Sequence, residues 1–227
     1  ESFVNSKQRR VPVSLDAPVF TLTHAMGFKG VLGGEYNFNR TEASIWKRFW
    51  LPASWGKIDC SVKAGAEWNT VPFPLLILPE ANLSYITQRE TFCLINNMEF
   101  LNDRFASMSI SYDMNGKLFN RIPLLKNLKW REMFRVRALW GTLTDKNNPF
   151  KSSNPDLFRF PTRDGKFTSF VMDPKVPYVE ASVGIYNIFK LLHVEYVHRF
   201  TYRDNPGINK NGIRFMAVSY THLTLPT

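Results

Sequence analysis

The stretch that decides the fold is Ile58-Asp59-Cys60-Ser61-Val62-Lys63-Ala64-Gly65-Ala66-Glu67-Trp68. Every even-numbered position in it is apolar, and every odd-numbered position is polar, charged or glycine. Because successive side chains of a β-strand point to opposite faces, this alternation predicts a strand with one apolar and one polar face. Its length also matches the roughly 9–11 residues that a tilted membrane-spanning strand requires.

The same alternation recurs along the chain, as in the apolar even-numbered positions from Ala106 to Met114. Helical periodicity is nearly absent except at 122–128, where Pro123 begins one amphipathic turn. The glycines of 30–34 predict a hairpin turn rather than a phosphate loop, since no Lys-Ser/Thr pair or helix follows them. We therefore expect about nine strands, near residues 17–28, 36–50, 57–69, 91–101, 104–114, 129–143, 178–189, 191–203 and 212–220.

The connections between these strands are uneven in length. Residues 101–104 and the region around Lys190 predict tight turns, whereas 70–90 and 144–177 are long and rich in proline. Membrane barrels usually carry short turns on one side and long loops on the other. Strict alternation of nine strands places the two long connections on opposite sides. Either a strand is miscounted, for instance around 167–172, or the protein departs from the rule, and the pattern alone does not assign sidedness.

The composition excludes several classes of protein. A hydrophobic share of 44% is too high for a disordered chain, and a mean hydropathy of −0.23 is too low for a bundle of membrane helices. No run approaches the roughly 18 consecutive apolar residues of a spanning helix. The net charge of +10 is spread along the sequence instead of gathered on one face, so we expect no nucleic-acid partner. The aromatic share of 15% suits strands and the aromatic girdles of membrane barrels.

Strand length and charge favour a membrane barrel over a soluble one. Soluble strands average about 5–6 residues, and the expected strands run to ten or more. The polar face also carries opposed acidic and basic residues, which a water-filled lumen can hold in pairs. These lumen charges could tune passage through the barrel or form a structural network that fills it. The candidates are Lys63, Glu67, Arg135, Arg137, Glu180, Glu195 and Arg199.

No arrangement of residues predicts catalysis, a metal or a cofactor. His193 and His198 are five positions apart on one strand and face opposite sides, so they cannot share a metal ion. Cys60 and Cys93 lie on separate expected strands and are interpreted as small apolar residues, although a disulfide is possible. A hydrolase at the barrel rim remains an alternative, but turn chemistry explains its acidic candidates, Asp103, Asp113 and Asp145, better. We expect no enzyme.

An ordered set of segments resembles one bacterial family. The segments are Lys47–Pro52, Val71–Leu76, Asn97–Phe100, Phe119–Leu125, Leu128–Glu132, Pro177–Ile185 and Arg199–Arg203. They are similar to the outer-membrane barrel proteins of Bacteroidetes-type bacteria that carry a carboxypeptidase-regulatory-like domain ahead of the barrel. This barrel family is known as domain of unknown function 5686. The resemblance implies the C-terminal part of such a barrel, with a signal peptide, the non-catalytic regulatory-like domain and further strands upstream.

The resulting expectation is an all-β, antiparallel part of a transmembrane barrel in the bacterial outer membrane. Its partners would be outer-membrane lipid, the barrel-assembly machinery and the remaining strands of the full-length barrel. Its role in transport, assembly or envelope maintenance is open, and a soluble lipid- or ligand-binding barrel is the alternative. Residues 1–16 would be an upstream loop or strand remnant, and 17–217 the partial barrel. Residues 218–227, which include His222, resemble a translated sequencing adapter and are expected to be non-native.

Overall fold

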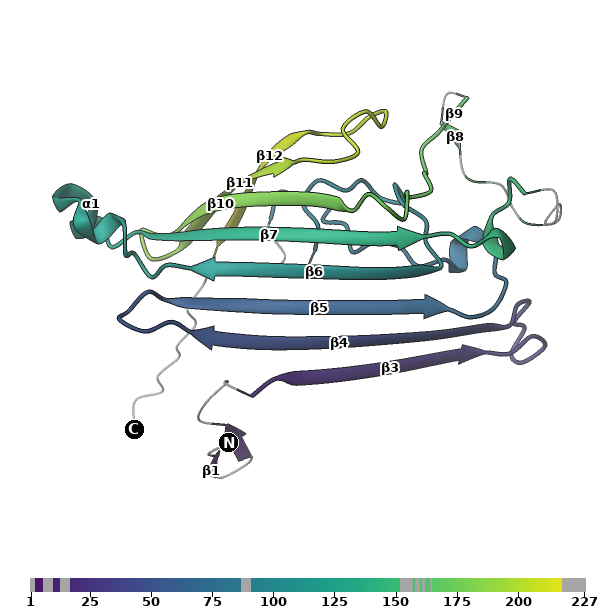
Figure 1. The fold of residues 1–227 in the computed structure, drawn as a ribbon, viewed down its shortest axis with the longest axis horizontal. Coiled ribbons are helices and arrows are strands. Elements are labelled where there is room, and N and C mark those ends of the chain that lie inside the picture. Colours follow the sequence, from purple (N-terminus) through teal and green to yellow (C-terminus); the bar gives the residue numbers. More distant parts are fainter. Residues whose placement is uncertain are drawn as a thin grey trace.

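A single antiparallel sheet of eight strands dominates the computed structural model (Figure 1). The structure describes residues 3–5, 10–12, 17–86, 91–151, 157, 160, 162–163 and 165–217. The strands of the sheet are β3 (Val19–Gly27), β4 (Phe38–Trp50), β5 (Lys57–Glu67), β6 (Arg104–Asp113), β7 (Arg131–Thr142), β10 (Tyr178–Ile188), β11 (Leu192–Arg199) and β12 (Asn211–Ala217).

The sheet is a meander in which each strand pairs with the next one along the chain. Its order is β12-β11-β10-β7-β6-β5-β4-β3, and all pairs are antiparallel. The register aligns the alternating pattern, so that Ile45, Val62, Met108 and Ala138 lie in one row across four strands. The all-β antiparallel prediction is therefore confirmed. The sheet is open, and β3 and β12 are its edges.

One predicted strand, 91–101, is wrong. Its residues form bends, turns and isolated bridges, and Met98 has a φ of 58° that extended backbone does not allow. The run from Phe92 to Ile95 is apolar without alternation and is buried throughout, so it packs like a core segment instead of a two-faced strand. The tight turn predicted at 101–104 consequently does not connect two strands. The strand suspected at 167–172 is also absent, since only the short hairpin of β8 (Thr162–Arg163) and β9 (Lys166–Phe167) lies nearby.

With that strand removed, the two longest connections lie at one end of the sheet and the two shortest lie at the other. One end, on the right in Figure 1, carries the connections 28–37, 68–103, 143–177 and 200–210, and we call it the long-loop end. The other, the short-turn end, carries 51–56, 114–130 and 189–191. The two Pro-rich excursions thus leave the same end, and the apparent conflict in the sequence came from the miscounted strand.

The remaining elements are small. The predicted helical turn is confirmed as α1 (Pro123–Leu128), which follows η2 (Phe119–Arg121) in the 114–130 connection. The long connections contain η1 (Phe73–Leu75) and η3 (Asp145–Asn147), and β1 (Phe3–Asn5) pairs with β2 (Arg10–Pro12). No helix among the described residues has the length and apolarity to cross a membrane. The predicted non-native tail, 218–227 with His222, lies outside the described residues, as do 1–2, 6–9 and 13–16.

The apolar face of the sheet is exposed and residues of its polar face are buried, which is the opposite of the arrangement in soluble proteins. On the apolar face, Val62, Val183 and Tyr196 are 47%, 45% and 47% exposed. On the polar face, Arg137 and Arg199 are 2% and 0% exposed. Soluble proteins bury their apolar side chains and rarely bury Arg or Glu completely. Over β7, β10 and β11, the charged face is therefore the interior of this molecule.

The polar face is buried because a connection folds back onto it. We call residues 71–102, of which all but 87–90 are described, the insert. Phe92, Ile95 and Phe100 of the insert pack with Leu139 and Tyr178 of the sheet. Further clusters join Cys93 and Leu94 to Val197, and Val71 to Leu101, Leu143 and Phe160. The core therefore lies between the insert, the polar face and the 143–177 connection.

Candidate functional site

All seven charges predicted to face a lumen lie on the polar face. Lys63 and Glu67 belong to β5, Arg135 and Arg137 to β7, Glu180 to β10, and Glu195 and Arg199 to β11. The register gathers those of β7, β10 and β11, because Glu180 lies directly opposite both Arg137 and Arg199. Lys63 and Glu67 stand apart and contact other partners.

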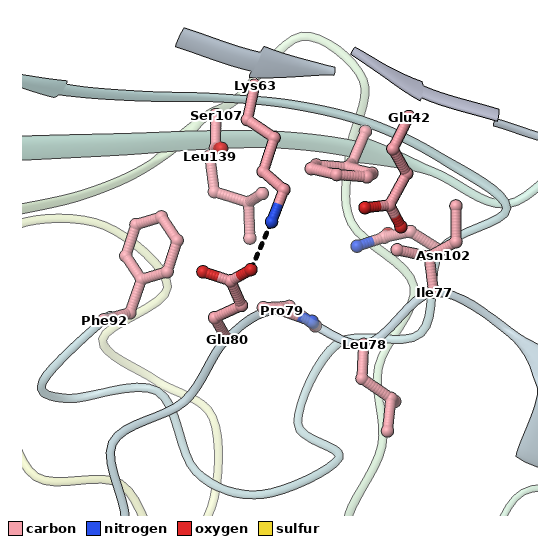
Figure 2. A pocket seen from close by; sticks show the side chains of 11 residues that line it. Glu42, Lys63, Ile77, Leu78, Pro79, Glu80, Phe92, Asn102, Ser107 and Leu139 are labelled. Atoms are coloured by element: carbon pink, nitrogen blue, oxygen red, sulfur yellow. Dashed lines mark hydrogen bonds and ion pairs between the residues drawn. The ribbon is translucent and has the colours of Figure 1, made fainter. Parts of the chain in front are cut away.

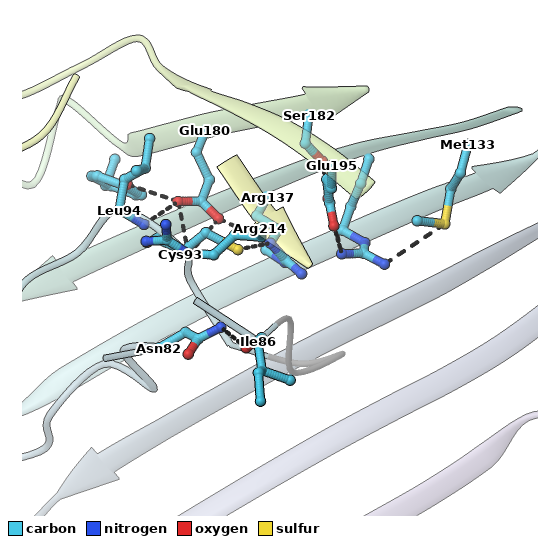
Figure 3. Close-up of polar contacts among 12 residues, drawn as sticks. Asn82, Ile86, Cys93, Leu94, Met133, Arg137, Glu180, Ser182, Glu195 and Arg214 are labelled. Carbon is cyan, nitrogen blue, oxygen red and sulfur yellow. Dashed lines mark hydrogen bonds and ion pairs between the residues drawn. The ribbon is translucent and has the colours of Figure 1, made fainter. Parts of the chain in front are cut away.

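Glu180 is the centre of the network. Its carboxylate lies 3.0 Å from the Arg137 guanidinium and accepts a hydrogen bond of 2.9 Å from the Tyr178 hydroxyl. It also accepts the backbone N–H groups of Cys93 and Leu94 in the insert, at 2.9 and 3.1 Å (Figure 3). The insert is therefore bonded through its backbone to a buried, ion-paired carboxylate.

Arg199 contacts the same insert through a second set of hydrogen bonds. Its guanidinium donates to both carboxylate oxygens of Glu99, at 2.6 and 3.1 Å, and to the carbonyl of Leu94 at 3.2 Å. The guanidinium lies 4.8 Å from the centre of the Tyr178 ring. A bidentate Arg–carboxylate pair fixes direction as well as distance, so the turn that carries Glu99 is oriented on the sheet.

Glu195 forms the third buried pair. Arg135 donates to it at 3.0 Å, the Ser182 hydroxyl donates to it, and the His193 ring lies 3.4 Å away. As predicted, His193 and His198 do not share a site, because His193 is buried on the polar face whereas His198 contacts Asn211 on the opposite face.

Lys63 contacts the insert at a second place, whereas Glu67 contacts residues of β4. Lys63 pairs with Glu80 of the insert across an open recess that is also lined by Glu42, Asn102 and Phe105 (Figure 2). Glu67 accepts the backbone N–H of Asn39 at 2.9 Å and lies 3.7 Å from Arg40. Neither residue joins the network around Glu180.

The two cysteines are both free thiols. Cys60 lies on the apolar face of β5 and Cys93 in the insert, so the interpretation as small apolar residues fits both. The Arg137 guanidinium lies 3.4 Å from the Cys93 sulfur. Burial raises the pKa of the Cys93 thiol, and the neighbouring Arg137 charge opposes the shift. The thiol is therefore protonated and unreactive at neutral pH.

The acidic residues considered for a hydrolase have structural partners. Asp103 is buried and accepts hydrogen bonds from Thr144 and from the Asn147 amide at 2.9 Å. Asp113 accepts the N–H of Asn115 two residues later and the Tyr186 hydroxyl, and Asp145 begins η3 with a 77% exposed side chain. Among the described residues, no three His, Cys, Asp or Glu side chains are arranged to hold a metal ion.

Sequence reasoning missed the partners that the insert contributes. Glu99 and Glu80 were not among the candidates, because the first lay on a wrongly predicted strand and the second on a connection. The available signal was an excess of one basic residue among the seven candidates, four basic against three acidic, which called for an acidic residue from elsewhere. A carboxylate in a connection long enough to reach the sheet meets that requirement.

A comparison with protein families matches residues 1–150 to the family of unknown function DUF5686, C-terminal domain. The match spans about two thirds of the chain and includes β3 to β7 together with the insert. A search of curated proteins finds no match. The chain therefore belongs to the DUF5686 family, within its C-terminal domain.

Proposed function

We propose that this chain forms part of the wall of a β-barrel in the bacterial outer membrane, with its apolar face against lipid and the insert inside the barrel. The observation that carries the proposal is the reversed burial: charged side chains are enclosed while a broad apolar face is left uncovered. In water such a face would be costly, at about 25 cal/mol for each Å² of apolar surface. In a bilayer the same face is matched to its surroundings.

Strand geometry supports this proposal. An eleven-residue strand such as β5 is about 36 Å long at roughly 3.3 Å per residue. Tilted by about 40°, it covers some 27 Å along the membrane normal, close to the roughly 25 Å apolar band of outer-membrane barrels. The two longest connections leave one end and the two shortest leave the other, which also agrees with such barrels, whose long loops are extracellular.

The open edges indicate the remaining partners. Among the described residues, β3 pairs only with β4. β12 pairs with β11, and its outer edge is bridged only at Phe215, whose N–H donates to the Tyr85 carbonyl of the insert. Unpaired edge groups are not tolerated in the hydrocarbon layer. Additional strands of a full-length barrel would satisfy them, and the barrel-assembly machinery would insert the closed product.

The position of the insert limits the functions that such a barrel can have. Because it fills the polar side of β7, β10 and β11, an open water-filled pore does not fit this arrangement. Transport would require the insert to move, whereas assembly or envelope maintenance would not. The structural hydrogen bonds of Asp103 and Asp113 speak for a non-enzymatic role. The apolar face outside and the charges inside also disfavour a soluble lipid- or ligand-binding barrel.

Neighbouring residues of β3 test the proposal. Thr21 and Leu22 are both exposed, but they lie on the polar and the apolar face respectively. Leu22→Arg places a charge in lipid and should cost about 2–4 kcal/mol, whereas Thr21→Arg should change little. The readout is the folded fraction of the full-length protein in phospholipid vesicles, measured by heat-modifiable gel migration. In a soluble protein both exposed substitutions would be harmless, and equal effects would reject the membrane assignment.

A further inference from the structure

The short-turn end differs from the long-loop end in charge. Its three connections contain five basic residues and no Asp or Glu: Lys117, Arg121, Lys126, Lys129 and Lys190. The four connections of the long-loop end contain ten basic and ten acidic residues. The net positive charge of the connections therefore gathers at one end of the sheet.

The 114–130 connection combines this charge with exposed apolar side chains. Leu118, Ile122, Leu124 and Leu128 are between 42% and 76% exposed, and Arg121, Lys126 and Lys129 are exposed beside them. The next turn repeats the combination, since Phe189 and Leu191 flank Lys190 and all three are exposed. Exposed leucines between lysines are typical of segments that lie in a membrane interface.

Hydrogen bonds direct this connection toward the apolar face. Glu132 has the same strand parity as Phe134 and Val136, which lie on the apolar face, and its carboxylate accepts the N–H of Phe119. The connection is also tied to both neighbouring turns, because Lys117 donates to the Ala53 carbonyl at 2.9 Å and Asn187 donates to the Lys129 carbonyl at 2.7 Å. The segment is therefore held at the strand ends on the side that the proposed barrel turns to lipid.

An aromatic residue continues the surface across the same end. Trp55 is 38% exposed in the 51–56 turn, and the Lys117 ammonium lies 5.0 Å from the centre of its ring. Tryptophan beside lysine is the composition that membrane–water interfaces select.

From these observations we infer that the 114–130 connection is a docking surface for anionic phospholipid headgroups of the leaflet at the short-turn end. The Lys and Arg side chains neutralise the phosphates, and Ile122, Leu124 and Leu128 enter the boundary between headgroups and acyl chains. The inference rests on the proposed membrane position of the sheet and adds a lipid charge preference and an orientation to it. The long-loop end, with balanced charge, has no such preference.

The test places a polarity-sensitive fluorophore at Leu124→Cys in a Cys60→Ala background of the full-length protein. The matched control carries the label at Leu32→Cys, a fully exposed position at the long-loop end. Both are reconstituted into phosphatidylcholine vesicles with or without phosphatidylglycerol. We expect emission at position 124 to shift to shorter wavelength and to be quenched by headgroup-level spin labels when phosphatidylglycerol is present, while position 32 stays in water.

Two further measurements complete the experiment. Replacing Lys117, Arg121, Lys126 and Lys129 by Gln should abolish the phosphatidylglycerol-dependent shift. So should 1 M salt on the unsubstituted segment, where the screening length falls to about 3 Å, and this arm needs no folding-competent variant. A label at 124 that is as water-exposed as the label at 32, in protein that resists extraction from the vesicles, overturns the inference alone. Protein that does not remain with the vesicles overturns the proposed function as well.

Discussion

Strands β3 and β11 carry similar alternating patterns but have opposite environments. Every residue of β3 from Val19 to Met26 is exposed on both faces, whereas in β11 the polar-face residues His193, Glu195, Val197 and Arg199 are all buried. The difference lies in what covers them, because the insert packs on β7, β10 and β11 and leaves β3 bare. The alternating pattern of a strand therefore shows that its two faces differ. Which face is enclosed depends on a segment that is distant in the sequence.

We expect the largest difference in stability when a buried carboxylate is removed from the part of the sheet that the insert covers and the result is compared with a change near the bare strand β3. Glu180→Ala leaves Arg137 without its ion-pair partner and two insert N–H groups without an acceptor, which should cost about 3–5 kcal/mol. Asp59→Ala breaks the Arg48–Asp59 pair beside the bare part, whose side chains are 15% and 27% exposed, and should cost less, about 1 kcal/mol. The measurement is the urea dependence of unfolding in lipid vesicles or detergent. Equal losses would mean that the insert does not enclose Glu180.

A smaller effect is expected from filling space under the covering segments. The β-carbon added by Gly141→Ala would lie 2.4 Å from the side chain of Asn102, which is 1% exposed, so the insert must shift. Overpacking of this kind costs about 1–3 kcal/mol. On the bare strand β3, Ala25 is exposed and no segment covers it. Ala25→Val should therefore change the free energy of unfolding by no more than about 0.5 kcal/mol. The same unfolding assay compares them, and an unaffected Gly141→Ala protein would show that Asn102 is free to move.

The smallest effect concerns pH. Because burial raises the pKa of Cys93, the folded state keeps this thiol protonated while the unfolded state ionises near its ordinary value of 9.0. The stabilising contribution is thus complete below that pH and is lost as pH rises toward the folded-state pKa. The unfolding midpoint should decline above about pH 9, and Cys93→Ala should flatten the decline. An unchanged slope in the Cys93→Ala protein would remove Cys93 as its source.

Local patterns were enough to predict most of the sheet. Eight of the nine expected strands are present, and all seven candidate charges lie on the polar face. These successes share a physical basis, since the direction of a strand side chain depends only on its parity along the backbone. The helical turn after Pro123 follows from the same kind of local rule.

The failure at 91–101 has a different origin. Its apolar run is compatible with a strand by composition, but its residues are buried by contacts with β7, β10 and β11, which lie far along the chain. Short apolar runs do not distinguish a strand from a buried irregular segment. That single error moved the long connections to opposite ends and hid Glu99 as the partner of Arg199.

The sequence by itself determined the strands, their parity and the existence of one charged and one apolar face, because these depend on steric rules that act between neighbouring residues. Only the tertiary structure decided that the insert covers the charged face, that Glu180 and Arg199 hold the insert, and that the two shortest turns share one end. Those features depend on how a connection of more than thirty residues returns to the sheet. Its path is set by packing and ion pairs between residues about a hundred positions apart, such as Glu99 and Arg199, which no local pattern records.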